Sequence, residues 1–436
     1  MEVDGMSKYF QSEGGFLASL RGAADVKAVD DVTFDIKKGE TLALVGESGC
    51  GKSTLARTIL QLHRPTEGSI RFKGTDLTDL SSREIRPLRQ DMQMVFQDPH
   101  SSLNPRLKVG QIIEEPMKAH DMYDAAGRRE RAEKLLESVG LEAAHYHRYP
   151  HEFSGGQRQR VNLARAFSTD PEIIMCDEPT SALDVSVQAQ VLNVMKRLQD
   201  EFGVTYLFIS HDMSVVRYVA DRVAVMYLGH VAELAEKEAL FENPKHPYTR
   251  ALLDSIPVPD PRSTGERGTL AGDVPSPTNP PSGCRFRTRC PKLIQPGTYD
   301  VTREELADDA AGAALQSYDL DEPTWRNVIG FVRAVDRRSF TLENVEDSPD
   351  AVRAFLDERF FAGSTPSGEP ADVIDDAARL LAEERWDEAA DHLRTTFEEP
   401  SICAARRPAY VLEEDVEEER FVACHLYRDS ETDSSH

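Results

Sequence analysis

The chain has 436 residues, of which 76 are acidic and 51 basic, and it carries a net charge of −25 with a pI near 4.9. This length suits two or three domains, and the negative charge argues against a nucleic-acid partner, because phosphate binding needs clustered Lys and Arg. No run approaches the roughly 18–20 apolar residues of a membrane span, and residues 1–5 have neither the basic nor the apolar part of a secretory signal.

The first motif that carries chemistry lies near the N-terminus. Residues 46–53 read Gly-Glu-Ser-Gly-Cys-Gly-Lys-Ser and match Gly-x-x-x-x-Gly-Lys-Ser, the phosphate-binding loop. Residues 41–45 predict a buried strand before the loop, and residues 54–60 predict a helix after it, which is the context that the motif needs. The glycines let backbone N–H groups surround phosphate oxygens. We therefore expect ATP to bind to Gly46, Glu47, Ser48, Gly49, Cys50, Gly51, Lys52, Ser53 and Thr54.

Within this loop, Lys52 would reach the β- and γ-phosphates, and the hydroxyl of Ser53 would hold Mg²⁺. A second anion-binding segment is predicted at residues 154–157, Ser-Gly-Gly-Gln, where Ser154 would cap a helix and the glycines Gly155 and Gly156 would allow a close backbone approach. Taken alone, this segment could equally be an ordinary capped helix.

Two apolar strands further along the chain end in polar residues. Residues 173–178 end in Asp177 and Glu178, and residues 207–212 include His211. After a phosphate loop, Asp177 would complete the Mg²⁺ site, Glu178 would polarise the attacking water, and His211 would contact the γ-phosphate. The alternative is that the two acids cap a surface turn and that His211 is structural.

In this order and spacing, the segments resemble those of the ATP-binding cassette (ABC) ATPases over residues 1 to about 250. The resemblance implies further roles by position. Phe10 would stack on adenine, although the adjacent Tyr9 could take this role, and Gln97 would sense Mg²⁺ and the membrane partner. Gln157 would complete a signature segment that faces the ATP of a second subunit. The loop that crosses the dimer interface would comprise Ser181, Ala182, Leu183 and Asp184.

The resemblance is more specific in four segments, which are similar to the oligopeptide/dipeptide/nickel importer branch and, within it, to the F-type ATPase subunit. These segments are residues 96–106, 149–157, 246–253 and 283–291. The implied fold is α/β: an ABC-type P-loop ATPase with antiparallel β and helical subdomains. The implied partners are two membrane permeases, a D-type ATPase and an extracellular solute-binding protein, which would place the chain at the cytoplasmic face of the membrane. The alternatives are an ATPase for another solute such as nickel, and a soluble ABC ATPase outside transport.

The expected domains are an ATPase cassette at residues 1–254, a Pro/Gly/Ser-rich linker at 255–283, and a Cys-bearing domain at 284–436. Residues 292–400 are expected to form a helical insertion in that last domain, because apolar residues recur there at i, i+3 and i+4. Residues 291–402 hold 26 acidic and 11 basic side chains. We expect a small bundle that packs on its own core, with partner docking as the alternative.

The overall acidity predicts a halophilic, archaeal source, the alternative being a merely acidic insertion.

The chain has six cysteines. Cys176, in the strand before Asp177, is expected to be a small core residue. Four others lie in the C-terminal domain, and three interpretations stay open for them: a [4Fe–4S] cluster, for which the resemblance also speaks, a zinc site, or plain thiols. These candidate ligands are Cys284, Cys290, Cys403 and Cys424.

Overall fold

The computed structural model describes residues 1–11, 25–256, 272–296, 318, 320–343, 345–362, 366–413 and 419–430. The chain divides into two compact units, Met1–Asn243 with Pro277–Asn279, and Pro244–Ser276 with Pro280–His436. Residues 257–271, most of the expected linker, and residues 297–317 of the expected insertion lie outside the described residues.

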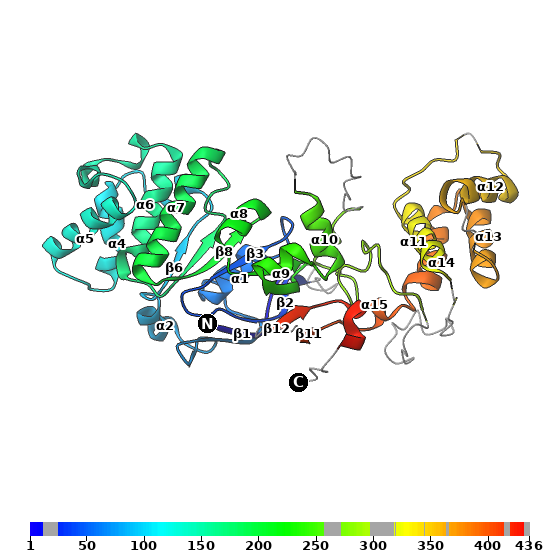
Figure 1. Ribbon diagram of the computed structural model, residues 1–436, viewed down its shortest axis with the longest axis horizontal. Helices are drawn as coiled ribbons and strands as arrows, with labels where there is room; N and C mark the ends of the chain where they lie inside the picture. Colours follow the sequence, from blue (N-terminus) through cyan, green and yellow to red (C-terminus); the bar gives the residue numbers. More distant parts are fainter. Residues whose placement is uncertain are drawn as a thin grey trace, which may run out of the picture. The chain divides into compact units, whose positions relative to one another are not determined.

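The first unit contains a small antiparallel sheet in the order β2-β1-β4-β5, as expected from the resemblance. Figure 1 labels its strands β1 and β2. Its strands are β1 (Glu2–Gln11), β2 (Asp25–Asp35), β4 (Glu67–Phe72) and β5 (Thr75–Asp76). Buried and exposed residues alternate along the second half of β2, which is the pattern of a strand with one face on the core.

A second, mostly parallel sheet carries the phosphate loop. Within the first unit its strand order is β10-β9-β3-β8-β7-β6. The strands are β3 (Thr41–Val45), β6 (Met92–Val95), β7 (Ile173–Asp177), β8 (Thr205–Ser210), β9 (Arg222–Tyr227) and β10 (His230–Glu236). Every residue of β3, β7 and β8 is buried, as is usual for parallel strands covered on both faces. The predicted strands at residues 41–45 and 173–177 are therefore confirmed.

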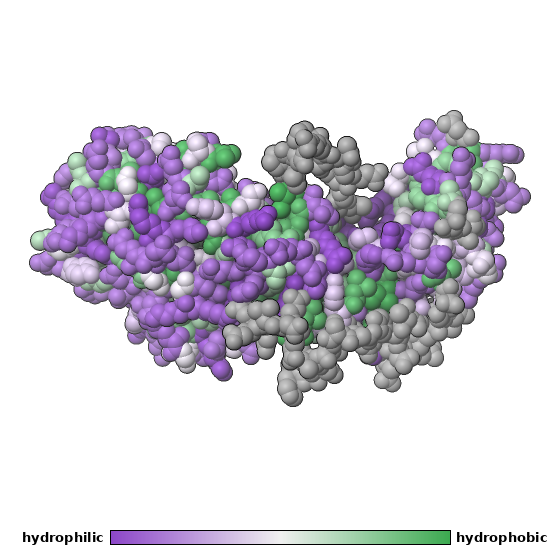
Figure 2. Space-filling model, in the orientation of Figure 1, coloured by the Kyte–Doolittle hydropathy of each residue, from purple (hydrophilic) through white to green (hydrophobic). Residues whose placement is uncertain are grey.

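Nine α-helices accompany these sheets in the described part of the first unit: α1 (Lys52–Ile59), α2 (Ser82–Leu88), α3 (Pro99–Ser102), α4 (Val109–Ala119), α5 (Ala125–Ser138), α6 (Gly155–Ala166), α7 (Val185–Phe202), α8 (Met213–Val219) and α9 (Lys237–Glu242). The helices α4, α5 and α6 group together in Figure 1 and share one apolar core with β7 and α7. On the face shown in Figure 2, mostly hydrophilic side chains cover α4 and α5.

The second unit is mainly helical where it is described. Its elements are α10 (Pro247–Asp254), α11 (Glu322–Asp336), α12 (Pro349–Phe360), α13 (Glu369–Ala382), α14 (Trp386–Leu393), α15 (Ile402–Ala405) and the antiparallel strands β11 (Tyr410–Glu413) and β12 (Glu419–Val422). The apolar spacing predicted α12, α13 and α14. It missed α11, although Trp325, Val328, Ile329 and Val332 have the same spacing and are all buried.

Two segments of this unit contact each other: the cysteine segment, residues 283–295, and the helical segment, residues 320–405. The helices of the helical segment share one apolar core. This core contains Leu293 and Ile294, which lie within the expected insertion at residues 292–400, and also Ile402 and Cys403, which lie beyond it. Among the residues that the structure describes, no helix combines the length and the apolar composition needed to cross a membrane.

Candidate functional site

The phosphate loop connects β3 to α1, and its lysine is held against it. Lys52 is the first residue of α1 and is 5% exposed. Its ammonium group donates to the carbonyl oxygens of Gly46 at 2.8 Å and Glu47 at 3.0 Å. The N-terminus of a helix attracts anions, because its first N–H groups have no partner within the helix. The cation and these N–H groups therefore lie at the same end of α1.

Two glycines of this loop cannot be replaced without displacing the backbone around them. Gly46 has φ 148° and Gly51 has φ 108°, a region that favours glycine. A Cβ atom on Gly46 would lie 2.1 Å from the carbonyl oxygen of Met226, and one on Gly51 would lie 2.1 Å from that of Ala28. The motif therefore has its glycines where the fold leaves no room for a side chain.

Asp177, at the end of β7, is 1% exposed and faces the start of α1. Its Oδ1 accepts a hydrogen bond from the hydroxyl of Ser53 at 2.7 Å. Its Oδ2 lies 3.6 Å from Nη2 of Arg57 and accepts no hydrogen bond from the described residues. Burial raises the pKa of Asp177, while the Ser53 hydroxyl and the Arg57 charge oppose that shift. A hydroxyl beside a carboxylate oxygen without a hydrogen bond fits Mg²⁺, which takes few protein ligands when it also binds phosphates.

Glu178 lies between two residues that are distant in sequence. Its Oε2 accepts a hydrogen bond from the amide of Gln97 at 2.9 Å and lies 3.3 Å from Nδ1 of His211. The three residues follow β6, β7 and β8, which are neighbouring parallel strands. The carboxyl ends of such strands meet at one edge, where ligands bind in open α/β sheets. The structure thus brings together the predicted catalytic acid, the glutamine and the histidine.

The signature segment begins α6 as predicted. Ser154 accepts a hydrogen bond from the N–H of Gln157, and the Gln157 side chain accepts one from the N–H of Ser154, at 3.3 and 3.0 Å. This is a capping box, which satisfies two N–H groups at once. A Cβ atom on Gly156 would lie only 2.1 Å from Cγ1 of Val187. The second glycine therefore lets α6 approach the start of α7.

The expected dimer loop lies between Glu178 and α7. Ser181 donates its hydroxyl to the carbonyl oxygen of Glu178 at 3.1 Å, and Asp184 caps α7 by accepting from the N–H of Val187 at 3.0 Å. Val185, directly after the cap, is 82% exposed. Val185 was not among the residues expected in the dimer loop, although it directly follows Asp184 in the sequence.

The two candidate aromatic residues on β1 have different surroundings. The Tyr9 hydroxyl donates to Oδ1 of Asp30 at 2.5 Å, and burial together with this bond raises the pKa of Tyr9. The Phe10 ring lies edge-to-face with His63 at 5.4 Å, and the Lys8 ammonium lies 5.0 Å from its centre. Because Tyr9 is bound to Asp30, the arrangement favours Phe10 for stacking. His63 and Arg57 had no signal in the sequence.

The cysteines are all free thiols. Cys176 is fully buried in the core, as expected. In the second unit, burial raises the pKa of all four thiols, to about 12 for Cys290, and the charge of neighbouring cysteines adds to the shift for Cys284, Cys290 and Cys424. Among the described residues, however, no three Cys, His, Asp or Glu side chains are placed to hold a metal ion. The four thiols share one buried region, but in these positions they do not form the expected cluster site.

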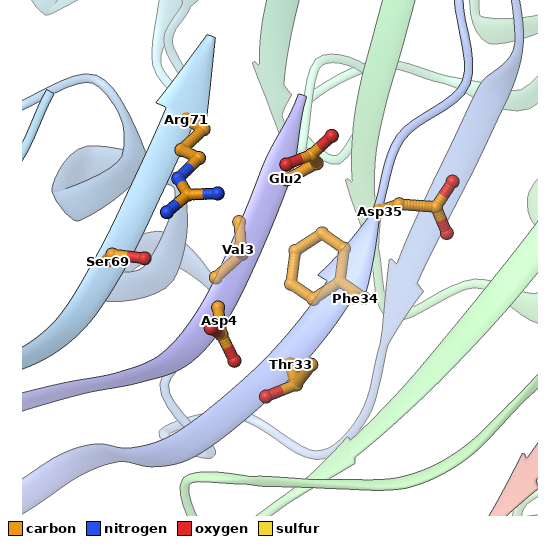
Figure 3. Close-up of a pocket in the computed structure, with 8 residues that line it drawn as sticks. All are labelled: Glu2, Val3, Asp4, Thr33, Phe34, Asp35, Ser69 and Arg71. Carbon is orange, nitrogen blue, oxygen red and sulfur yellow. The ribbon is translucent and has the colours of Figure 1, made fainter. Parts of the chain in front are cut away.

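A shallow depression of about 360 Å³ lies on the antiparallel sheet, where β1, β2 and β4 run side by side (Figure 3). The residues that line it are Glu2, Val3, Asp4, Thr33, Phe34, Asp35, Ser69 and Arg71. None of these is a residue that the sequence predicted for the ATP site, so the depression has no part in the site described above.

Three family models match the chain. Residues 29–181 match the ABC transporter family, and residues 232–295 match the C-terminal region of oligopeptide/dipeptide transporters. Residues 322–416 match a domain of unknown function (DUF8228).

Individual proteins are also similar. The oligopeptide transport ATP-binding protein AppF of Bacillus subtilis is 56% identical over 294 residues, which cover 67% of this chain and 89% of AppF. A putative peptide import ATP-binding protein of Brucella ovis is 51% identical over 294 residues, covering 67% of this chain and 90% of the relative. Among solved structures, the dimeric ATP-binding cassette MJ0796 bound to ADP and Pi matches with a TM-score of 0.48 and 31% identity, over 54% of this chain and 98% of that one.

Proposed function

Because the chain belongs to the ABC transporter family of oligopeptide transport ATP-binding proteins, we propose that it hydrolyses ATP to drive the uptake of oligopeptides, dipeptides or a related solute. The observation that carries this proposal is the arrangement of Lys52, Ser53, Asp177 and Glu178 around the end of one parallel sheet. This arrangement provides a cation, two oxygen ligands and a carboxylate, which are the groups that phosphoryl transfer to water requires.

ATP binding would use the start of α1. Lys52 would exchange its bonds with Gly46 and Glu47 for bonds with the β- and γ-phosphates, while the loop N–H groups surround the same oxygens. Ser53, Gln97 and Asp177 would hold Mg²⁺, which neutralises charge on the phosphates. Phe10 would stack on the adenine ring.

Hydrolysis would depend on positioning more than on covalent chemistry. Glu178 would orient the attacking water, and Gln97 and His211 would fix the position of its carboxylate through the contacts at 2.9 and 3.3 Å. His211 would also contact the γ-phosphate. Its side chain is 61% exposed beside Glu178 and is therefore accessible to a bound nucleotide.

The complete site would need a second ATPase subunit. Ser154, Gly155, Gly156 and Gln157 would face the ATP bound to the phosphate loop of the partner. The loop formed by Ser181, Ala182, Leu183 and Asp184 would cross the interface. We propose that the partner is a D-type ATPase and this chain the F-type subunit, so that the isolated chain is a poor ATPase. Strong activity that does not depend on the concentration of the isolated chain would contradict this assembly.

The further proposed partners are two membrane permeases and an extracellular solute-binding protein, with this chain at the cytoplasmic face. The direct test is reconstitution of the chain with its permeases and second ATPase in proteoliposomes. ATP-dependent uptake of labelled oligopeptides is expected. Uptake of nickel but not of peptides would favour the second candidate solute, and ATPase activity that no permease or solute changes would contradict transport.

We further propose that the second unit binds a [4Fe–4S] cluster. Its ligands would be Cys284, Cys290, Cys403 and Cys424. The support for the cluster is the presence of four free cysteines in one unit, three of them buried, and binding a metal would have to remove their protons. Their sulfur atoms would have to move together, since no metal-binding group is formed by the described residues. Anaerobic purification tests it: about four irons per chain are expected, and an iron-free protein of full stability would contradict it.

We also propose a halophilic, archaeal source, based on the net charge of −25. Acidic surfaces repel themselves less when salt screens them. Unfolding midpoints measured over a salt series should fall steeply below roughly 0.1 M, where the Debye length reaches about 10 Å. A midpoint independent of salt would leave a merely acidic segment as the explanation.

A further inference from the structure

The cysteine segment takes its conformation from the helical segment. It contains neither helix nor strand, so its carbonyl groups need partners from elsewhere. The helical segment supplies four of them: Arg333 Nη2 donates to Arg287 O at 2.9 Å, Arg337 Nη2 to Thr288 O at 3.3 Å, Trp325 Nε1 to Leu293 O at 2.5 Å, and Ser401 Oγ to Ile294 O at 2.6 Å.

A buried carboxylate joins the two segments electrostatically. The side chain of Glu398, in the helical segment, is only 5% exposed. Its Oε2 lies 3.7 Å from Nη1 of Arg287 in the cysteine segment, and its Oε1 lies 3.6 Å from Nε of Arg333 in α11. We call these three residues the buried ion cluster. Removing one partner from such a cluster leaves an uncompensated buried charge, which strongly destabilises the contact.

Apolar packing connects the same two segments. Leu293 and Ile294 of the cysteine segment share one core with α11–α14, and Cys403 belongs to this core as well. Cys284 packs against it, and the N–H of Cys284 donates to the carbonyl oxygen of Cys403 at 2.8 Å. Cys284 and Cys403 therefore lie where the two segments meet, and Cys290 is buried within the cysteine segment.

We propose that the helical segment covers the cysteine segment, so that the thiols where the two meet are shielded, and that the buried ion cluster helps the hydrogen bonds given above to hold the two segments together. Arg333 and Glu398 are then positioning residues for the cysteines. This gives a role to the region that matches a domain of unknown function. The inference does not depend on a metal, because the labelling is carried out on protein shown to be free of iron.

The test compares thiol alkylation in the full-length chain and in Glu398→Gln. Native protein is treated with N-ethylmaleimide, and labelling of each cysteine is followed by mass spectrometry. Without the carboxylate, Arg287 and Arg333 repel each other, so labelling of Cys290 and Cys403 should accelerate at least roughly tenfold. Unchanged labelling rates would overturn the proposal.

The matched control is Glu388→Gln, the same substitution at an exposed carboxylate of α14 that pairs with Arg385. It should leave the labelling rates at the wild-type value, and an equal acceleration in this control would overturn the assignment to the buried cluster. Cys176, in the core of the first unit, serves as internal reference and should stay unlabelled in both variants.

A second measurement decides the question if Glu398→Gln does not fold. Hydrogen exchange of the wild-type chain reports local opening directly. If the helical segment covers the cysteine segment, the N–H groups of Arg287 and Arg289, which bond to Cys284 and Phe286, should exchange no faster than those of α11. Exchange at least about a hundredfold faster than in α11 would show that the two segments open separately, and would overturn the proposal.

Discussion

Nδ1 of His211 lies 3.3 Å from Oε2 of Glu178, the oxygen that also accepts the amide hydrogen of Gln97. Glu178 follows β7 and His211 follows β8, so the pairing of these two parallel strands brings the residues together. Glu178 has φ 45°, an uncommon conformation for a residue with a side chain. Such conformations concentrate at functional sites, where the surrounding structure maintains them.

Glu178→Gln should keep ATP binding and lose turnover. The amide has the same shape but cannot polarise water as a carboxylate does, so the ATPase rate should fall at least about tenfold, or about 1.4 kcal/mol of barrier. The variant should also accumulate as an ATP-bound dimer in size-exclusion chromatography. Glu130→Gln, at an exposed carboxylate of α5, is the control. Near-normal turnover in the assembled complex would remove Glu178 from its catalytic role.

Lys52→Ala should weaken nucleotide binding, the step that precedes hydrolysis. The ammonium group that now bonds to Gly46 and Glu47 is the cation nearest to the predicted phosphates. Titration with a fluorescent ATP analogue should show at least about a tenfold weaker affinity, since a charge-assisted hydrogen bond is worth roughly 1.5–3 kcal/mol. Lys38→Ala, at an exposed position, should leave the affinity unchanged, and equal affinities in all three proteins would contradict the assignment.

Gly156→Ala should disturb the signature helix but not ATP binding by the same chain. The new methyl group would lie 2.1 Å from Cγ1 of Val187, so α6 and α7 must move apart. We expect the ATPase rate of the assembled complex to fall at least about tenfold, while the isolated chain binds ATP normally. Adding Val187→Ala removes the clashing atom and should restore most of the rate. Full activity of the single variant would show that this close approach is dispensable.

The raised pKa of Tyr146 should make the free energy of unfolding decrease at high pH. Its hydroxyl donates to Glu114 at 2.5 Å, and burial, then this bond, raises the pKa of Tyr146 to about 12. The unfolded chain ionises this tyrosine near pH 10 and the folded chain only near 12, so stability is lost as pH rises between these values. Tyr146→Phe should therefore lose less stability than wild type from pH 10 to 12, as measured by urea unfolding. Parallel losses in both proteins would contradict the shift.

The helices of the second unit show what the spacing of apolar residues can predict and what it cannot. The spacing of Val373, Ala377, Leu380 and Leu381 predicted a helix, and α13 confirms it. The same spacing could not predict what the helices pack against. Leu293 and Ile294 belong to the same core although they lie far from α13 in the sequence, and the spacing of apolar residues within a helix does not predict such a contact.

The sequence by itself determined the chemistry of the ATP site, because the phosphate loop, the capped signature helix and the acids after a buried strand are local patterns whose residue types follow from backbone geometry and charge. Only the tertiary structure decided which of these residues meet. The strand order placed Gln97, Glu178 and His211 at one sheet edge. The packing around β1 bound Tyr9 to Asp30 and placed the Phe10 ring against His63. It also put Glu398 between two arginines beside buried thiols. Such pairings depend on strand order and packing, which join residues that the chain itself keeps apart.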